Sequence, residues 1–127
     1  MNARATKSLA ANGFSFARAM IVAGDINSRP GRAPGNDEPP SDDEILARLL
    51  SGAGLVDACK VVQANTCDNQ IDHMMYRSGD GVVLQAIDWH IDEDFIDEDG
   101  SPLSDHAAIA VKFVWSQTPV RVAIDLQ

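Results

Sequence analysis

The sequence predicts an α/β sandwich. Segments typical of helices and strands alternate in the first half of the chain, and strands dominate in the second half, which favours this class over a helical bundle. The chain has 127 residues, of which 45% are hydrophobic, enough for one domain with a core. It contains no internal repeat, and its one biased segment is a stretch rich in Pro and Gly.

The first predicted elements are a helix over residues 3–11 and a strand over residues 19–24. The segment ARATKSLAA at 3–11 has helix-forming composition and is followed by Asn-Gly, a typical helix stop. The strand is apolar and is followed by SRPGRAPGNDEPP at 28–40. The density of Pro and Gly there predicts a loop.

A second helix is predicted to begin after this loop. Ser41 is a natural N-cap and Glu44 stands three residues later, so the two can form a capping box. Two aspartates between them suit the positive end of a helix. One apolar face follows, made of Ile45, Leu46, Leu49 and Leu50. Gly52 or Gly54 is predicted to end the helix.

Three further strands are predicted, over residues 70–77, 81–91 and 107–115. The last, AAIAVKFVW, is the longest apolar stretch and predicts a buried central strand. A turn is predicted at SGDG, residues 78–81, between the first and second of these strands. Between the second and third lies the acidic segment DEDFIDEDGSPLSD at 92–105. Counted back from its glycine, an EF-hand would place Phe95 first and His106 twelfth, so the calcium motif fails and a solvated loop is predicted.

The charge and the apolar runs restrict the partners. A net charge of −9 opposes binding to nucleic acid, because such affinity comes largely from Lys and Arg on phosphates, although a site can be locally positive. The apolar runs are far shorter than the roughly 20 residues that a membrane-spanning helix needs, so no transmembrane segment is expected. The N-terminal segment lacks the apolar centre of a signal peptide, and the compartment is left open.

Two cysteines, Cys59 and Cys67, leave two interpretations open. They have no CxxC or His-rich neighbourhood, which argues against zinc. A disulfide closing this short loop would suit an exported protein, and two free thiols would suit the cytosol.

Polar residues at predicted strand ends are the candidates for a functional site. Asp25 and Asn27 follow the first strand, Asp72 lies in IDHMMYR, and Asp105-His106 precedes the last strand. Each alone has a simpler explanation as a turn, a cap, an arginine partner or a structural histidine. Together they are typical of metal-assisted phosphoryl chemistry, in which carboxylates hold Mg²⁺, an imidazole handles a proton and an amide binds a phosphate oxygen. Ligands of α/β folds usually bind at strand ends.

Three segments carry a resemblance to a known family. In order along the chain, GDIN, IDHMMYR and LSDHAAIAVKF resemble the C-terminal half of the endonuclease/exonuclease/phosphatase superfamily, from about Met20 to Trp115. The passage YRS…VVLQA…FIDEDGSPLSDH is more similar to the bacterial and fungal sphingomyelinase-like phosphodiesterases than to the DNA-repair branch. The resemblance implies the C-terminal half of a four-layer α/β/β/α sandwich of the deoxyribonuclease-I-like type, with residues 1–127 forming one partial domain and residues 20–115 its motif-bearing core.

The resemblance also implies a role for each site residue. Asp25 would orient or deprotonate the attacking water, and Asn27 would bind a phosphate oxygen. Asp72 would hold the imidazole of His106, which would act as general base or stabilise charge on the phosphoryl group. Asp105 would ligate Mg²⁺, or Mn²⁺ in its place.

Three other side chains are weighed separately. Arg29 is near enough to Asn27 to bind phosphate, although a surface arginine is the simpler expectation. His73 follows Asp72 in a strand and is expected to point to the opposite face. His90 is left out of the site with the same caution.

The resemblance leaves two functions open. Family members carry a first half that supplies an asparagine, a metal-binding glutamate and a second histidine, and none can be placed in the 24 residues before Asp25. One hypothesis is a divalent-metal-dependent phosphoester hydrolase in an incomplete domain, acting on a lipid head group, an inositol phosphate, a nucleotide or nucleic acid. The alternative is a non-catalytic remnant or interaction module. A half-sheet would expose an apolar face, which predicts low stability or self-association.

Overall fold

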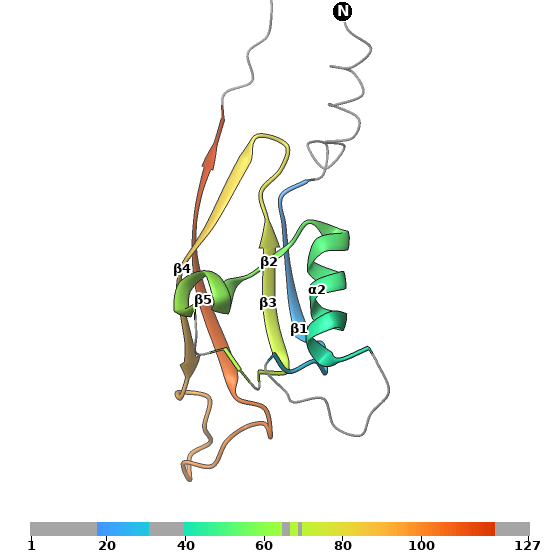
Figure 1. The fold of residues 1–127 in the computed structure, drawn as a ribbon. Helices are drawn as coiled ribbons and strands as arrows, with labels where there is room; N and C mark the ends of the chain where they lie inside the picture. The colour runs from blue at the N-terminus through green and yellow to red at the C-terminus, as the bar shows by residue number, and fades with distance from the viewer. Residues whose placement is uncertain (1–17, 31–39, 65–66, 69, 119–127) are drawn as a thin grey trace, which may run out of the picture.

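The computed structural model describes residues 18–30, 40–64, 67–68 and 70–118. Within them the chain forms two helices and five strands (Figure 1), namely β1 (Met20–Asp25), α2 (Asp42–Ala53), β2 (Val56–Asp57), α3 (Ala58–Gln63), β3 (Asp72–Arg77), β4 (Val82–Asp92) and β5 (Ala108–Gln117). The helix predicted over residues 3–11 lies outside the described residues. The predicted strands and the second predicted helix are all present, with ends shifted by one or two residues.

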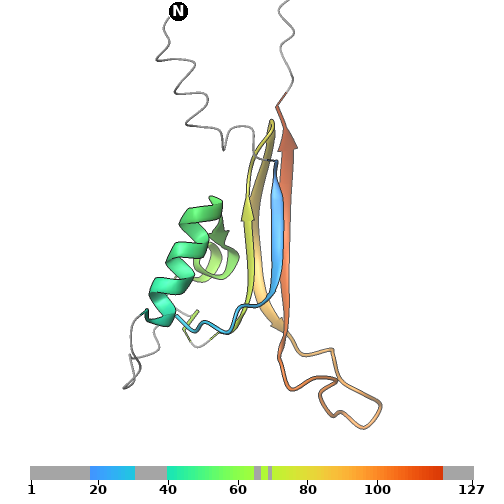
Figure 2. The ribbon, with the colours of Figure 1, turned by 90° about the vertical axis from the view of Figure 1, so that its right-hand side faces the viewer.

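The first sheet has the order β1-β3-β2, with both neighbours antiparallel to β3. Val22 pairs with Met75, and both side chains lie on the face that packs against α2. Met75 and Leu46 of α2 are almost fully buried and form the centre of this cluster with Leu55. Of the apolar face predicted for α2, Leu46 and Leu50 pack against the sheet, whereas Ile45 and Leu49 are exposed. Figure 2 shows both helices on one side of the strands.

The second sheet is the antiparallel pair β4-β5, with a register shift between Ala86 and Asp88. A two-residue turn with positive φ at Asp80 and Gly81 connects β3 to β4, as the SGDG sequence predicts. The two sheets meet where Tyr76 of β3 contacts Phe113 of β5 edge to face, with ring centroids 5.1 Å apart. The second core cluster forms around this contact.

Helix α2 begins and ends as its sequence predicts. The Ser41 side chain accepts from the Glu44 N–H and the Glu44 carboxylate accepts from the Ser41 N–H, which is the predicted capping box. Gly54, one of the two predicted stops, is the C-cap at φ 65°, a left-handed conformation that glycine adopts without strain.

Two elements were missed by sequence reasoning, namely β2 and α3. The side chain of Asp57 caps α3 by accepting the Cys59 N–H at 2.9 Å. A disulfide joins Cys59 to Cys67, so it ties α3 to the segment that leads into β3. Both elements are too short for a periodic pattern, and their positions depend on contacts with β3 and β4.

The prediction of a buried central strand over residues 107–115 is wrong. Within the described residues β5 pairs only with β4, so it has one strand neighbour. Its side chains are half-buried or exposed, and Trp115 keeps 68% of its surface accessible. An apolar run records a preference for burial but does not say which neighbours will provide it.

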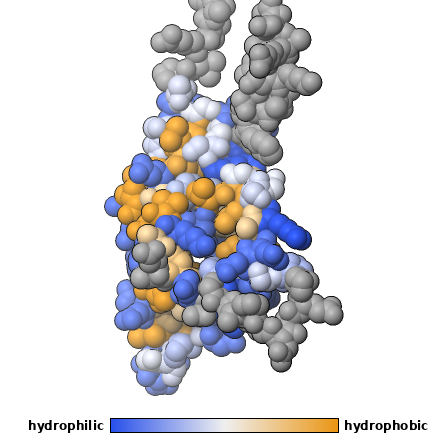
Figure 3. Space-filling model, viewed as in Figure 1, coloured by the Kyte–Doolittle hydropathy of each residue, from blue (hydrophilic) through white to orange (hydrophobic). Residues whose placement is uncertain are grey.

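The fold is mixed α/β with two small sheets and few helices. The four-layer sandwich implied by the resemblance stays a prediction. The described surface exposes several large hydrophobic side chains, among them Phe95, Leu103 and Trp115. Figure 3 shows apolar areas on the face turned to the viewer, separated by hydrophilic residues. Self-association through such surface also stays a prediction.

Removing the disulfide is expected to destabilise the fold. The Cys59→Ala/Cys67→Ala variant should lose about 2.5 kcal/mol of unfolding free energy, the size expected from chain entropy for a bridge that closes so short a loop. Urea unfolding followed by circular dichroism measures the difference. Dithiothreitol should bring the wild-type midpoint down to that of the variant and leave the variant unchanged. Equal midpoints for the oxidised protein and the variant would contradict a stabilising bridge.

Candidate functional site

Two carboxylates face each other where β1 ends and β3 begins. Asp25 and Asp72 are partners in the antiparallel register, so their side chains lie on the same face of the sheet. That face is opposite to α2, because alternate residues of β3 such as Met75 pack on the helix. Two like charges directly opposite each other repel, and a cationic or hydrogen-bonding group between them is needed to offset the cost.

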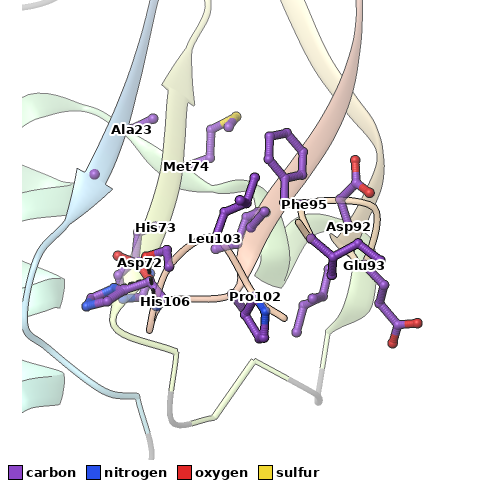
Figure 4. A pocket seen from close by; sticks show the side chains of 17 residues that line it. Ala23, Asp72, His73, Met74, Asp92, Glu93, Phe95, Pro102, Leu103 and His106 are labelled. Atoms are coloured by element: carbon purple, nitrogen blue, oxygen red, sulfur yellow. Dashed lines mark hydrogen bonds and ion pairs between the residues drawn. The ribbon is translucent and has the colours of Figure 1, made fainter. Parts of the chain in front are cut away.

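His106 supplies that group from the loop before β5. Its Nδ1 lies 2.7 Å from Oδ2 of Asp72, although the two residues are 34 positions apart in the sequence. Figure 4 shows both side chains together at one end of a cavity. The imidazole keeps 36% of its side-chain surface exposed and Asp72 keeps 25%, so solvent and small solutes can reach the pair.

The carboxylates around His106 raise the pKa of its imidazole above the ordinary value. The hydrogen bond to Asp72 is the main cause, and the charge of Asp72 adds to it. The charges of Asp105 and Asp25 act in the same direction at longer range. His106 therefore holds its second proton to higher pH than a free imidazole does.

The segment after β1 is bent tightly beside the cluster. Ile26 still pairs with the β3 side, because its N–H donates to the Ile71 carbonyl at 2.9 Å. Asn27 then adopts a left-handed conformation, φ 55°, and its N–H donates to Oδ1 of Asp25 at 2.8 Å. Asn tolerates this conformation better than most residues. The predicted phosphate ligand thus lies directly beside the Asp25 carboxylate.

The other predicted ligands lie at the margin of the cluster. Arg29 is exposed, and its backbone N–H donates to Asp42 in the first turn of α2. Asp105 is exposed next to His106 and influences it through its charge. The structure therefore brings Asp25, Asp72 and His106 together, with Asn27 beside them, and leaves Arg29 and Asp105 outside the contact. The catalytic and binding roles of these residues stay predictions.

The same three side chains form a group that could hold a metal ion. One ligand atom from each of Asp25, Asp72 and His106 can be chosen so that all lie within 4.8 Å of one another. Carboxylate oxygens suit Mg²⁺ and Mn²⁺, and an imidazole nitrogen is accepted by Mn²⁺ more readily than by Mg²⁺. The donor set fits the predicted class of cation. Asp105, the predicted ligand, is not a member of this group.

An apolar cavity of about 540 Å³ opens beside the cluster. Asp72 and His106 line one part of it, and Figure 4 shows Met74, Phe95, Pro102 and Leu103 around the rest. The sequence analysis predicted only a solvated loop over residues 92–105, and it did not predict that apolar side chains of this loop would line a cavity. The available signal was the apolar pairs Phe-Ile and Pro-Leu inside an otherwise acidic segment.

The acidic loop is exposed to solvent along residues 93–105, as predicted, and it folds back on itself. Ile96 forms a β-bridge with Pro102, and the Leu103 N–H donates to the Phe95 carbonyl at 3.2 Å. Oδ1 of Asp97 accepts from the backbone N–H of Ser101 at 2.8 Å. These bonds hold the apolar residues of the loop against the cavity. No residue of this loop belongs to the metal-binding group described above.

Two histidines lie outside the cluster. His73 is buried on the helix-facing side of β3, where its Nδ1 lies 2.7 Å from Oδ2 of Asp57. This agrees with the expectation that it points away from Asp72. His90 is exposed on β4 and contacts Asp88, also at 2.7 Å.

Comparison with known proteins shows a similarity that covers most of this chain and a small part of each relative. The chain is 34% identical over 113 residues to proteins described as "Sphingomyelinase" from Mycobacterium bovis and from two strains of Mycobacterium tuberculosis. The matched part is 78% of this chain and 21% of each relative, so the chain spans about a fifth of the length of the curated relatives it matches. No family model matches the chain, and no solved structure matches it. The similarity supports a sphingomyelinase-like relationship.

None of the helices in the described part of the chain is long and apolar enough to cross a bilayer.

Removing the Asp72 carboxylate is expected to lower the pKa of His106. Asp72→Asn abolishes the largest contribution to the raised value, and titration of the His106 ring by NMR measures the change. Asp105→Asn should lower this pKa less, because Asp105 acts only through its charge. Asp88→Asn removes a carboxylate from a different histidine and should leave His106 unchanged. An unaltered pKa of His106 in Asp72→Asn would contradict the hydrogen bond.

Proposed function

We propose that this chain carries part of the active site of a divalent-metal-dependent phosphodiesterase related to the sphingomyelinases. The observation that carries the proposal is the group formed by Asp25, Asp72 and His106, with the imidazole hydrogen-bonded to one carboxylate and near the other. A general acid or base needs this kind of oriented, partly exposed imidazole. The relationship to proteins described as sphingomyelinases supports the phosphodiesterase class.

Phosphodiester hydrolysis requires that water attack phosphorus while the alcohol oxygen leaves. Asp25, exposed at the end of β1, would orient the water and accept its proton as the new P–O bond forms. His106 would donate a hydrogen bond to the phosphoryl group and a proton to the leaving oxygen. Its raised pKa favours this donor role over that of a base. Asp72 would keep the ring oriented and stabilise its charge.

A divalent cation, Mg²⁺ or Mn²⁺, would neutralise charge that develops on the phosphoryl oxygens. The cluster carboxylates and Asp105, which lies next to His106 in the chain, are the residues that would hold it. Asn27 would contribute its amide to a phosphate oxygen, because its backbone is bonded to Asp25 at the edge of the cluster. Arg29 would approach the same phosphate from the surface.

The apolar cavity indicates which phosphodiesters would bind. A substrate with phosphate at His106 would place its neighbouring group near Met74, Phe95 and Leu103. That wall suits an alkyl chain or another apolar substituent, as in a phospholipid. The net charge of −9 disfavours nucleic acid as the main substrate.

We also propose that residues 1–127 form one partial domain, whose remaining site residues are supplied by further polypeptide. The matched share of 21% of each relative supports this proposal. A second copy of the chain, docked through the exposed apolar surface, is another source of such residues.

Metal-dependent hydrolysis of bis-p-nitrophenyl phosphate tests the proposed function. The purified chain should turn over this substrate with Mg²⁺ or Mn²⁺ and not with EDTA. Asp25→Asn and His106→Gln should each lower kcat by at least about 100-fold, the usual size of a general acid–base contribution. His90→Gln, which alters an exposed histidine outside the cluster, should retain wild-type turnover. Turnover that survives in both cluster variants would refute the assignment, and a complete lack of turnover would mean that this chain alone is a fragment of the active site or a non-catalytic remnant.

The proposed apolar subsite is tested with two substrates that differ only in one alkyl group. Octyl p-nitrophenyl phosphate, used below its micelle concentration, should have a KM at least about tenfold lower than methyl p-nitrophenyl phosphate, because each methylene removed from water contributes about 0.8 kcal/mol. Leu103→Asn should abolish most of the difference and leave the methyl substrate nearly unaffected. Val114→Asn, at an exposed position outside the cavity lining, is the control. Equal KM values for the two substrates would contradict the subsite.

A further inference from the structure

A buried polar network lies beneath the cluster, on the opposite face of β3. The Nδ1 atom of His73 contacts Oδ2 of Asp57 at 2.7 Å, and its Nε2 contacts the Ser28 carbonyl oxygen at 2.8 Å. Both side chains of the pair are 1% exposed. Asp57, His73 and Ser28 are the buried polar or charged residues of the described chain, and all three belong to this network.

The partners determine the hydrogens on the imidazole. A backbone carbonyl can only accept a hydrogen bond, and an ionised carboxylate likewise only accepts. With an ionised Asp57, both ring nitrogens of His73 donate, and the ring is then a cation paired with Asp57. The second oxygen of Asp57 accepts the Cys59 N–H at 2.9 Å, so the carboxylate is satisfied as well. Burial of two charges is tolerated only with such complete pairing.

This network joins three segments, and two of them also carry residues of the cluster. Ser28 follows Asn27 at the end of the bend after β1, His73 follows Asp72 in β3, and Asp57 ends β2. The hydrogen bond from His73 therefore holds the backbone one residue beyond the left-handed Asn27. That bend in turn directs the Asn27 N–H to the Asp25 carboxylate. Release of the Ser28 carbonyl would let the bend relax toward a more common conformation.

We propose that His73 and Asp57 are positioning residues for the candidate site, acting from the far face of β3. The His73–Ser28 hydrogen bond fixes the place of Asn27 and Asp25 relative to Asp72, which is anchored in the same strand as His73. The inference rests on the proposed function for its kinetic consequence, whereas its structural consequence stands independently. A displacement of about 1 Å at a reacting group can cost up to about 100-fold in rate.

The chain offers a matched control for this pair. His90 and Asp88 make the same Nδ1 to Oδ2 contact at the same 2.7 Å, but their side chains are 54% and 51% exposed. Neither residue lines the cavity or belongs to the cluster. His90→Gln therefore removes a chemically identical contact without releasing any segment of the site.

The experiment compares the wild-type chain, His73→Gln, the double variant His73→Gln/Asp57→Asn and His90→Gln. The double variant leaves no unpaired buried charge, so it remains foldable where the single variant is too unstable. NMR spectra monitor the backbone amide of Asn27 and the ring of His106. Hydrolysis of bis-p-nitrophenyl phosphate with Mn²⁺ gives kcat and KM, and circular dichroism verifies the fold.

Both His73 variants should shift the Asn27 amide resonance and lower kcat by 10- to 100-fold with KM within threefold of wild type. His90→Gln should change neither. A folded His73 variant with wild-type kcat and an unshifted Asn27 amide would overturn the proposal, and so would loss of fold in both His73 variants, which indicates a purely structural role. If the wild-type chain has no turnover, the isolated chain is not catalytic and the kinetic comparison gives no information. The Asn27 resonance alone then decides, and a shift in the His73 variants but not in His90→Gln upholds the positioning role.

Discussion

The antiparallel register of β1 and β3 is the constraint on which the site depends. It sets Asp25 directly opposite Asp72, where their charges repel, and this arrangement would be unfavourable without a donor between them. His106 provides the donor, and the two carboxylates in return raise the pKa of its imidazole. The attraction of both carboxylates to the one imidazole therefore offsets the repulsion between them. A bound cation would relieve the repulsion further.

Successive side chains of β3 lie on opposite faces of the sheet, so the strand contributes residues to two separate groups. Asp72 and Met74 face the cluster and the cavity, whereas His73 and Met75 face the helix side. The buried pair of His73 and Asp57 lies on the opposite face of β3 from the partly exposed pair of Asp72 and His106. The two histidines differ in their surroundings: desolvation opposes the charge on His73, but its hydrogen bonds to Asp57 and the Ser28 carbonyl outweigh that cost and raise its pKa.

The loop before β5 links the polar cluster to the apolar cavity. It contributes His106 at its end and the cavity residues Phe95 and Leu103 within it. The backbone bonds of the loop pair its two arms, so Phe95 and Leu103 lie opposite each other. A polar cluster beside an apolar surface is the combination that the proposed phospholipid substrate would require. The partial relationship to proteins described as sphingomyelinases is consistent with it.

Local signals in the sequence determined much of the fold. The capping box at Ser41, the stop at Gly54 and the turn at Gly81 depend on contacts within a few residues, and each appears where the pattern predicts it. The mixed α/β class and the three residues of the cluster, Asp25, Asp72 and His106, could likewise be named from strand ends and from the family resemblance, whereas their roles stay predictions. Short elements such as β2 and α3 could not, because they carry no periodic pattern and are held by neighbours distant in the sequence.

Tertiary structure alone decided how these pieces meet. The pairing of β5 with a single neighbour overrode its apolar sequence, and the folding of the acidic loop turned Phe95 and Leu103 toward a cavity. The sequence named Asp72 and His73 as neighbours in a strand, but only the fold gave one of them a site imidazole and the other a buried carboxylate. The reason is physical: local patterns record what a residue prefers, whereas partners dozens of positions away determine what it contacts.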